Sequence, residues 1–299
     1  MGAVIEAVVT AGHTSSDRPP SSTALAVEAA RRTLASAARR PDAIDLLVNA
    51  SVYRAANIME PANAAFVQRD VEADGEFAPV KGRRTLSFDI SNGACGMVNG
   101  LQVVDGFITS GAARHGLVVT GDVDPLPGRS EGYPYAPLGA AILLGPGGDA
   151  GFEAFALRSY PQYADLHTST IRWSGTEHVV GVHEDSAFHA RCEECADAAL
   201  TAFLDERRLT PDDVDLVVAS PPGVLKRRSS SPPAHPTLRA DQVLDADSLE
   251  PARVHTAGIA LALESALRSP RYPSAGRVLL VAVGSGITVA IASYRKPRS

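Results

Sequence analysis

The chain has few of the residues that mark several common classes of protein. Its 299 residues include only three cysteines, too few for a framework of disulfide bonds. We therefore expect reduced thiols and a cytoplasmic location. No uninterrupted apolar stretch is long enough to span a membrane, and residues 1–10 lack the basic start and the cleavage pattern of a secretory signal.

Aromatic residues and positive charge are also scarce. Phe, Trp and Tyr make up 5% of the chain, so alanine, valine and leucine must fill the core that a hydrophobic content of 45% allows. The formal net charge of −6 argues against binding to nucleic acid. A chain of this length forms one large domain or two of ordinary size.

Two segments of the chain share one pattern and indicate an internal duplication. Each has an amphipathic helix, a Pro-Asp turn and a buried strand of valine and leucine, with the helices expected over 24–40 and 188–209. The offset of about 170 residues is too long for a solenoid repeat. We therefore expect two α/β halves, residues 1–149 and residues 150–299.

The rest of the chain alternates strands with helices. Helices are expected over 95–110 and 256–267, and strands over 116–121, 139–144, 278–283 and 287–293. This alternation predicts mostly parallel sheets that helices cover on both faces. A functional site is expected where the two halves meet.

Residues 87–101 carry the strongest functional signal. A strand-like run ends in a turn of small residues, a helix-like run follows, and Cys95 stands at the junction. The thiol is thus placed at a helix N-terminus, where backbone N–H groups favour a thiolate and can bind an oxyanion. This pattern makes Cys95 a candidate acyl-carrying nucleophile. The alternative is a buried cysteine that packs as a small hydrophobic residue beside a tight turn.

These residues resemble the thiolase superfamily, and within it β-ketoacyl-ACP synthase III, or ketosynthase III. The family carries an Asp, a few small residues, a nucleophilic Cys, then Gly and a helix, and residues 89–101 look like that motif. Residues 117–123 resemble the family's next strand, and residues 278–288 resemble its glycine-rich terminal turn. The resemblance implies an α/β fold of duplicated halves in a five-layer α-β-α-β-α arrangement. We expect no cofactor.

The resemblance also implies a chemistry. In the family, the Cys takes an acyl group from a CoA or carrier-protein thioester, a His and an Asn assist the second substrate, and two backbone amides hold the thioester oxygen. Here the amides would belong to Cys95 and Gly286. His255 lies where the family has its Asn. It is either a general base in a Cys95–His255 dyad or a helix-capping or core histidine.

The chain departs from the family pattern in three places. Without gaps, the family's Cys falls on Ala94, and a local insertion at Gly93 would be needed to bring Cys95 into its place. Ser220 stands where the family has its His. The Ser/Pro-rich link over 10–22 is too short for the family's CoA-binding segment, which favours a carrier-protein donor, a small donor or no donor.

Two other clusters have an ordinary explanation beside a functional one. Residues 221–233 form a basic loop, either simply solvated or a cationic patch for an acidic carrier protein or a CoA phosphate. The histidines and cysteines over 183–195 imitate the spacing of a zinc site. Because Cys192 and Cys195 share one helical face with Phe188, we expect core residues there and no metal.

The leading hypothesis is a divergent ketosynthase-III-like acyltransferase of a specialised biosynthetic pathway, acylated on Cys95 and assisted by His255. The candidate pocket residues are Asn92, Ala94, Ser220 and Ser285. The missing family His favours transfer to an oxygen, nitrogen or sulfur nucleophile, or hydrolysis, over decarboxylative condensation. The alternative is a catalytically silent partner subunit of an active homologue. We expect a homodimer or such a heterodimer, with an acyl thioester from CoA or an acyl carrier protein as substrate, and no nucleic-acid or membrane partner.

Overall fold

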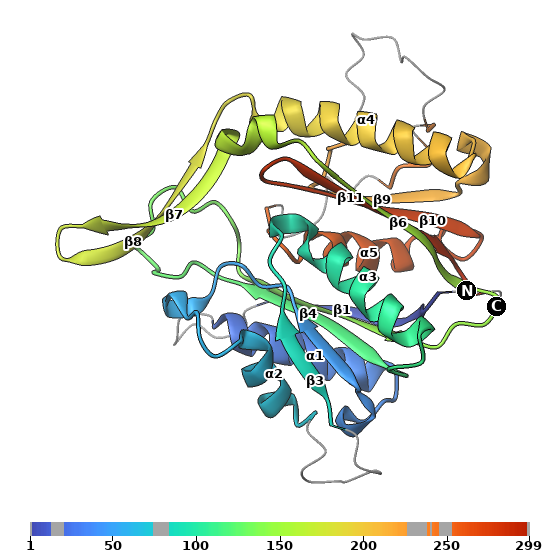
Figure 1. Cartoon of the computed structure of the whole chain (residues 1–299), viewed down its shortest axis with the longest axis horizontal. Helices are drawn as coiled ribbons and strands as arrows, with labels where there is room; N and C mark the ends of the chain where they lie inside the picture. Colours follow the sequence, from blue (N-terminus) through green and yellow to red (C-terminus); the bar gives the residue numbers. More distant parts are fainter. Residues whose placement is uncertain are drawn as a thin grey trace.

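Five stacked layers of secondary structure make up the molecule, in the order helix, sheet, helix, sheet, helix (Figure 1). The computed structural model describes residues 2–12, 21–73, 84–225, 238–239, 241–244 and 253–297. The outer layers hold helices α1 (Ser22–Ser36), α2 (Asn63–Val71) and α4 (Phe188–Arg207), and the middle layer holds α3 (Gly96–Thr109) and α5 (Gly258–Arg268). The five-layer α/β arrangement expected from the resemblance is confirmed.

The first sheet has five strands in the order β1-β5-β4-β2-β3. Its strands are β1 (Val4–Gly12), β2 (Leu46–Asn49), β3 (Leu86–Asp89), β4 (Gly116–Asp122) and β5 (Leu138–Gly145). Strand β2 is parallel to both β3 and β4, while β5 is antiparallel to β1 and β4. Because the carboxyl ends of parallel strands meet at one edge, the turns after β2, β3 and β4 lie together there.

The second sheet repeats the strand arrangement of the first. Its strands are β6 (Gly151–Ser159), β9 (Leu216–Ser220), β10 (Arg277–Gly284) and β11 (Thr288–Arg295), in the order β6-β11-β10-β9. Their pairing directions match those of β1-β5-β4-β2. The chain passes from one sheet to the other between β5 and β6. The origin of the halves by duplication stays a prediction.

Short 3-10 turns join several of these elements. They are η1 (Pro41–Ala43), η2 (Ala55–Asn57), η3 (Gly93–Cys95), η4 (Pro161–Leu166) and η5 (Pro211–Asp213). Each Pro-Asp repeat in the sequence forms one of these turns, η1 or η5, with proline at its start because proline fixes a helical φ and needs no hydrogen-bond acceptor there.

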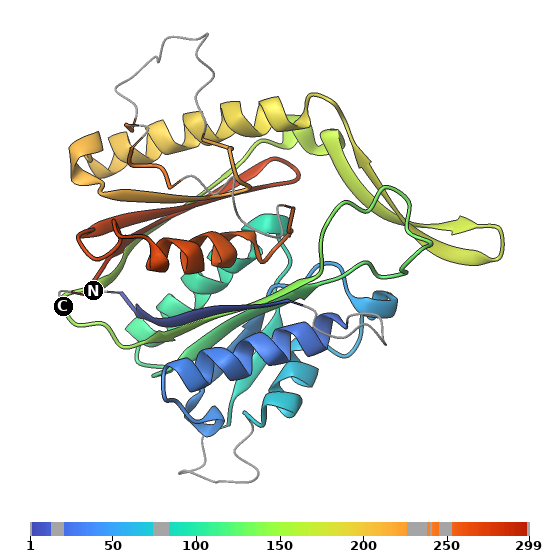
Figure 2. The same ribbon diagram turned by 180° about the vertical axis from the view of Figure 1, so that it is seen from behind.

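A two-stranded hairpin, β7 (His167–Ser174) and β8 (Glu177–Glu184), projects from one end of the layers (Figure 2). The sequence analysis did not predict it. Seven of the eight residues of β7 are exposed, so the strand has no buried apolar face of the kind that marks a strand in the sequence. Within β7, only His167, at the base of the hairpin, is buried.

Helix α3 fills the space between the two sheets. Met97 and Leu101 are fully buried there, among side chains of both sheets and of α5 such as Val118, Leu280 and Leu263. Two further clusters lie between α4 and the second sheet and between α1, α2 and the first sheet. Burying one such side chain stabilises the fold by about 1.5–3 kcal/mol. Because α3 is packed on both faces, these side chains fix its position and rotation between the sheets.

We expect Leu101→Ala to lower the free energy of unfolding by about 3 kcal/mol, because it leaves a cavity between α3 and both sheets. Urea unfolding followed by circular dichroism measures the change. The neighbouring Gln102→Ala is the control, since Gln102 is exposed on the same helix and its loss should change stability by less than about 0.5 kcal/mol. Equal effects of the two substitutions would contradict this packing.

Candidate active site

The turn between β3 and α3 meets the β10–β11 loop and the start of α5. Gly93 begins η3 with a φ of 50°, a left-handed conformation that glycine adopts without strain. A β-carbon built on Gly93 would lie 3.3 Å from Ser285 Oγ and 3.9 Å from His255 Nε2. The turn, Ser285 and His255 therefore converge on one point where the two halves meet.

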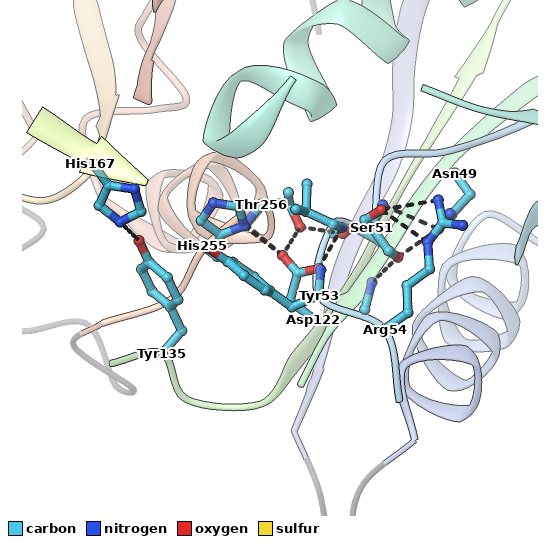
Figure 3. A network of polar contacts seen from close by, with 12 residues as sticks. Asn49, Ser51, Tyr53, Arg54, Asp122, Tyr135, His167, His255 and Thr256 are labelled. Carbon is cyan, nitrogen blue, oxygen red and sulfur yellow. Dashed lines mark hydrogen bonds and ion pairs between the residues drawn. The ribbon is translucent and has the colours of Figure 1, made fainter. Parts of the chain in front are cut away.

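His255 and Asp122 form a buried hydrogen-bonded pair beside this point (Figure 3). His255 Nδ1 lies 2.8 Å from Asp122 Oδ2, and the two side chains are 6% and 3% exposed. The amide and hydroxyl of Thr256 donate to the same oxygen, and the amides of Val52 and Tyr53 donate to Oδ1. Both oxygens of the carboxylate thus accept hydrogen bonds, from two segments that are far apart in the sequence.

These contacts set the charge of Asp122. Burial by itself would raise the pKa of its carboxyl group, but the hydrogen bonds from His255 and Thr256 outweigh burial and hold the pKa below its ordinary value. Asp122 is therefore ionised at neutral pH. It fixes the orientation of the imidazole through Nδ1 and leaves Nε2 directed toward Gly93, which is the arrangement of a histidine general base.

Three tyrosines and a second histidine pack beside His255. The rings of Tyr53 and Tyr135 have centroids 4.8 and 4.7 Å from that of His255, and Tyr133 lies against Tyr53. The Tyr135 hydroxyl is 3.0 Å from His167 Nε2 (Figure 3). Burial raises the pKa of each tyrosine and lowers the pKa of His167, so all four groups are neutral near pH 7.

A second carboxylate supports the turn but does not face the point of convergence. Asp89, at the end of β3, accepts hydrogen bonds from the amides of Asn63 and Ala64 at the start of α2. It also pairs with Arg54 at 2.8 Å and accepts a hydrogen bond from the Asn49 side chain. Its place is structural, because a carboxylate at a helix N-terminus satisfies amides that lack a partner within the helix.

The structure corrects the roles predicted for Cys95. Its side chain is fully buried, and its thiol lies 3.4 and 3.2 Å from the carbonyl oxygens of Ala282 and Thr288 in the second sheet. Burial raises the pKa of the thiol to about 12, so it stays protonated at neutral pH. Its amide donates to the Asn92 carbonyl at 3.0 Å and is not available to an oxyanion. The geometry fits the alternative of a buried, packed cysteine.

Ala94 lies against the β10–β11 loop and, unlike Cys95, is partly exposed. A β-carbon on Gly284 would lie 3.4 Å from Ala94 Cβ and 3.2 Å from its amide nitrogen, so the β10–β11 loop closes directly on the turn. Ala94, Ser285 and Gly286 are all partly exposed. Gly286 has a φ of 92°, which favours glycine in this loop.

The remaining predicted pocket residues have different surroundings. Ser220 is buried at the end of β9, against the first residue of α5. The side chain of Asn92 donates to that of Asn99 at 2.7 Å and so ties the turn to the first turns of α3. The structure therefore brings His255 and Ser285 together with Gly93 and Ala94. It leaves Ser220 beneath α5.

The sequence analysis missed Asp122, Tyr133, Tyr135 and His167 as parts of the site. Asp122 is the last residue of the buried strand β4, and that position was the available signal. The tyrosines come from a loop and His167 from the unpredicted hairpin, so nothing local in the sequence links them to His255. Proximity of this kind comes from tertiary packing alone.

Other expectations concern the cysteines of α4, metal binding, membrane helices and two loops. Cys192 and Cys195 are buried on one face of α4 with Phe188, as predicted for core residues. In the described ranges, no group of three or more His, Cys, Asp or Glu side chains is placed to hold a metal ion. Among these same residues, no helix is both long and apolar enough to cross a membrane. Residues 13–20 of the Ser/Pro-rich link and 226–233 of the basic loop lie outside the described residues.

Curated relatives of the chain share one description, although no family model matches it. β-Ketoacyl-ACP synthase III of Aquifex aeolicus is 24% identical over 275 residues, which cover 89% of this chain and 81% of that protein. The enzyme of Acidiphilium cryptum is 27% identical over 283 residues, with the same coverage. These identities make the chain similar to β-ketoacyl-ACP synthase III and fit a divergent ketosynthase III-like protein.

Solved structures show the same fold as this chain. A variant of OleA from Xanthomonas campestris superposes with a TM-score of 0.78 at 15% identity, covering 99% of this chain and 97% of that one. 3-Oxoacyl-ACP synthase III from Pseudomonas aeruginosa gives a TM-score of 0.78 at 20% identity, with 99% of each chain covered. OleA has also been solved with bound lauric acid and lauroyl-CoA.

We expect the Cys95 thiol of the native protein to resist iodoacetamide at pH 7.5, because it is buried and its pKa is raised to about 12. Peptide mapping by mass spectrometry measures the labelling. The same treatment in urea, where all three thiols are exposed, is the control. Labelling of Cys95 in the folded chain at the rate found in urea would contradict its burial.

The Asp122 carboxylate should stabilise the fold at neutral pH and not in acid. Its pKa is lower in the folded chain than the ordinary 3.8, so its contribution is complete above that value and is lost as the pH falls through the lowered pKa. We expect Asp122→Asn to cost about 3 kcal/mol at pH 7. The difference from the parent protein should shrink below about pH 4, measured by urea unfolding. Exposed Asp149→Asn is the control.

Proposed function

We propose that the protein transfers an acyl group from a CoA or carrier-protein thioester to a second nucleophile, with His255 as general base. The observation that carries this proposal is the buried His255–Asp122 pair, whose Nε2 faces the partly exposed turn at Gly93 and Ala94. The nucleophile is an oxygen, nitrogen or sulfur group of an acceptor, or water. We place the reaction in a specialised biosynthetic pathway.

Each group has one task in this reaction. His255 Nε2 accepts a proton from the attacking nucleophile as its bond to the thioester carbonyl forms. The carbon–sulfur bond then breaks, and the same nitrogen returns the proton to the departing sulfur. Asp122 stays ionised throughout and stabilises the imidazolium. We assign the amide of Gly286, in the loop beside the turn, as one donor to the thioester oxygen.

The relatives support a thioester substrate. The turn before α3 argues against a reaction through an acylated Cys95. The curated relatives are synthases that act with an acyl carrier protein, and OleA has been solved with lauroyl-CoA. In this chain the thiol of Cys95 is buried, and Ala94 offers no nucleophile at the place where the ungapped resemblance puts the family's Cys. We therefore propose acyl transfer and not decarboxylative condensation through an acylated Cys95.

Ala94 favours a second candidate, a catalytically silent subunit that pairs with an active homologue. Strand β3 is an edge strand of the first sheet, and Leu86 on it is 50% exposed. An open edge of this kind can pair with a strand of another chain. Under this candidate the isolated protein handles no thioester and gains its function in the complex. Homodimer or heterodimer formation stays a prediction.

We expect His255→Gln to slow thiol release from reactive acyl-CoA or acyl-carrier thioesters by about 10²- to 10⁴-fold, because the variant loses the general base. Asp122→Asn should slow thiol release by a similar factor, because the His255 imidazole loses the carboxylate that holds its orientation. A thiol-reactive dye follows the release.

Two substitutions serve as controls for that experiment. His189→Gln removes an exposed histidine of α4, and Cys95→Ala removes the buried thiol; both should keep the parent rate within about threefold. Parent-like rates in His255→Gln would contradict the proposed function. No release by the unmodified protein with any thioester would favour the silent subunit.

A further inference from the structure

Ser285 occupies the β10–β11 loop between two glycines and faces the same point as His255. Its Oγ lies 3.3 Å from the place of a β-carbon on Gly93, and His255 Nε2 lies 3.9 Å from that place. Because Gly93 carries no side chain, nothing of its own separates the hydroxyl from the imidazole. The Ser285 amide nitrogen lies 4.0 Å from the same place.

Three aliphatic hydroxyl and thiol groups near His255 are committed elsewhere. The Thr256 hydroxyl donates to Asp122 at 2.6 Å, and Ser220 is 3% exposed beneath α5. The Cys95 thiol contacts carbonyl oxygens of the second sheet. Ser285 is partly exposed. The Ser285 hydroxyl is therefore both accessible to a substrate and close to the general base His255.

The loop that carries Ser285 is held firmly. Strands β10 and β11 pair without a break up to Gly284 and Thr288, immediately before and shortly after Ser285. Gly284 lets the loop approach the turn before α3 closely, since a β-carbon there would lie 3.2 Å from the Ala94 nitrogen. A nucleophile needs such support, because small displacements of reacting groups cost large factors in rate.

We infer that Ser285 is the nucleophile that carries the acyl group, in a Ser285–His255–Asp122 triad. This inference rests on the proposed function and names its covalent step. Ser285 Oγ forms an ester bond with the acyl carbon while His255 Nε2 takes the hydroxyl proton. The carbon–sulfur bond breaks, and the proton leaves with the thiol.

The second half of the reaction reverses these roles. The acceptor attacks the ester carbon and gives its proton to His255 Nε2. The bond from carbon to Ser285 Oγ breaks, and the serine hydroxyl regains that proton. No oxidant, reductant or metal takes part, and atoms and charge balance at each step.

Acid-quenched reactions without acceptor test the inference, with butyryl-, octanoyl- and lauroyl-CoA and one acylated carrier protein as probes. Intact mass should show one acyl group on the protein, and peptide mapping should place it on Ser285. Ser285→Ala should carry no acyl group and should slow thiol release at least about 100-fold. Ser285→Cys should be acylated as a thioester that neutral hydroxylamine cleaves rapidly.

Ser91→Ala is the matched control, because Ser91 is an exposed serine at the start of the same turn. It should be acylated as the parent is. Thermal unfolding of each variant shows whether it is folded, and Ser285→Cys tests the position if Ser285→Ala is not.

The possible failures separate this inference from the proposed function. If Ser285→Ala releases thiol at the parent rate while His255→Gln does not, acyl transfer is direct and the serine role is overturned. An acyl group that maps to another residue overturns it as well. The serine role is also overturned if Ser285→Ala releases thiol slowly but neither the parent protein nor Ser285→Cys carries an acyl group. If His255→Gln keeps the parent rate, the proposed function fails first.

Discussion

The buried carboxylate of Asp122 is the interaction on which the site depends. It stands at the end of β4 and accepts hydrogen bonds from the loop after β2 and from the segment before α5, so it joins the two halves of the chain. A buried charge is tolerated only when its partners are in place. The same pairing therefore holds the halves in register and orients His255, which makes stability and the proposed chemistry parts of one arrangement.

The small residues at the start of α3 decide which chemistry the site can support. One residue along a helix corresponds to a rotation of about 100°, and here that step separates the partly exposed Ala94 from the buried Cys95. Packing of α3 on both sheets fixes this rotation. The thiol cannot turn outward without moving Met97 and Leu101 from the core, so its burial is a consequence of the whole middle layer.

The likeness to ketosynthases III and the departures from them belong to different levels of the structure. The layers and the strand order are features of the fold. Superposition on solved structures shows this fold even at 15–20% identity. The groups at the meeting point are individual side chains, and fold says little about them. The proposed roles of His255, Asp122 and Ser285 therefore rest on their own geometry, while the likeness supports only the thioester as substrate.

The sequence by itself determined the alternation of helices and strands and the paired helix-turn-strand units, because apolar periodicity and turn residues act locally. The segments that meet at the site were expected from the resemblance to ketosynthase III. It also proposed His255 and Ser285 as residues of that site, and the structure places the two side chains near each other beside Gly93. Only the tertiary structure decided that Cys95 is buried, that Asp122 is the partner of His255 and that Tyr53, Tyr135 and His167 gather around it. Those facts depend on the rotation of α3 and on contacts between distant segments, which packing of the complete core sets.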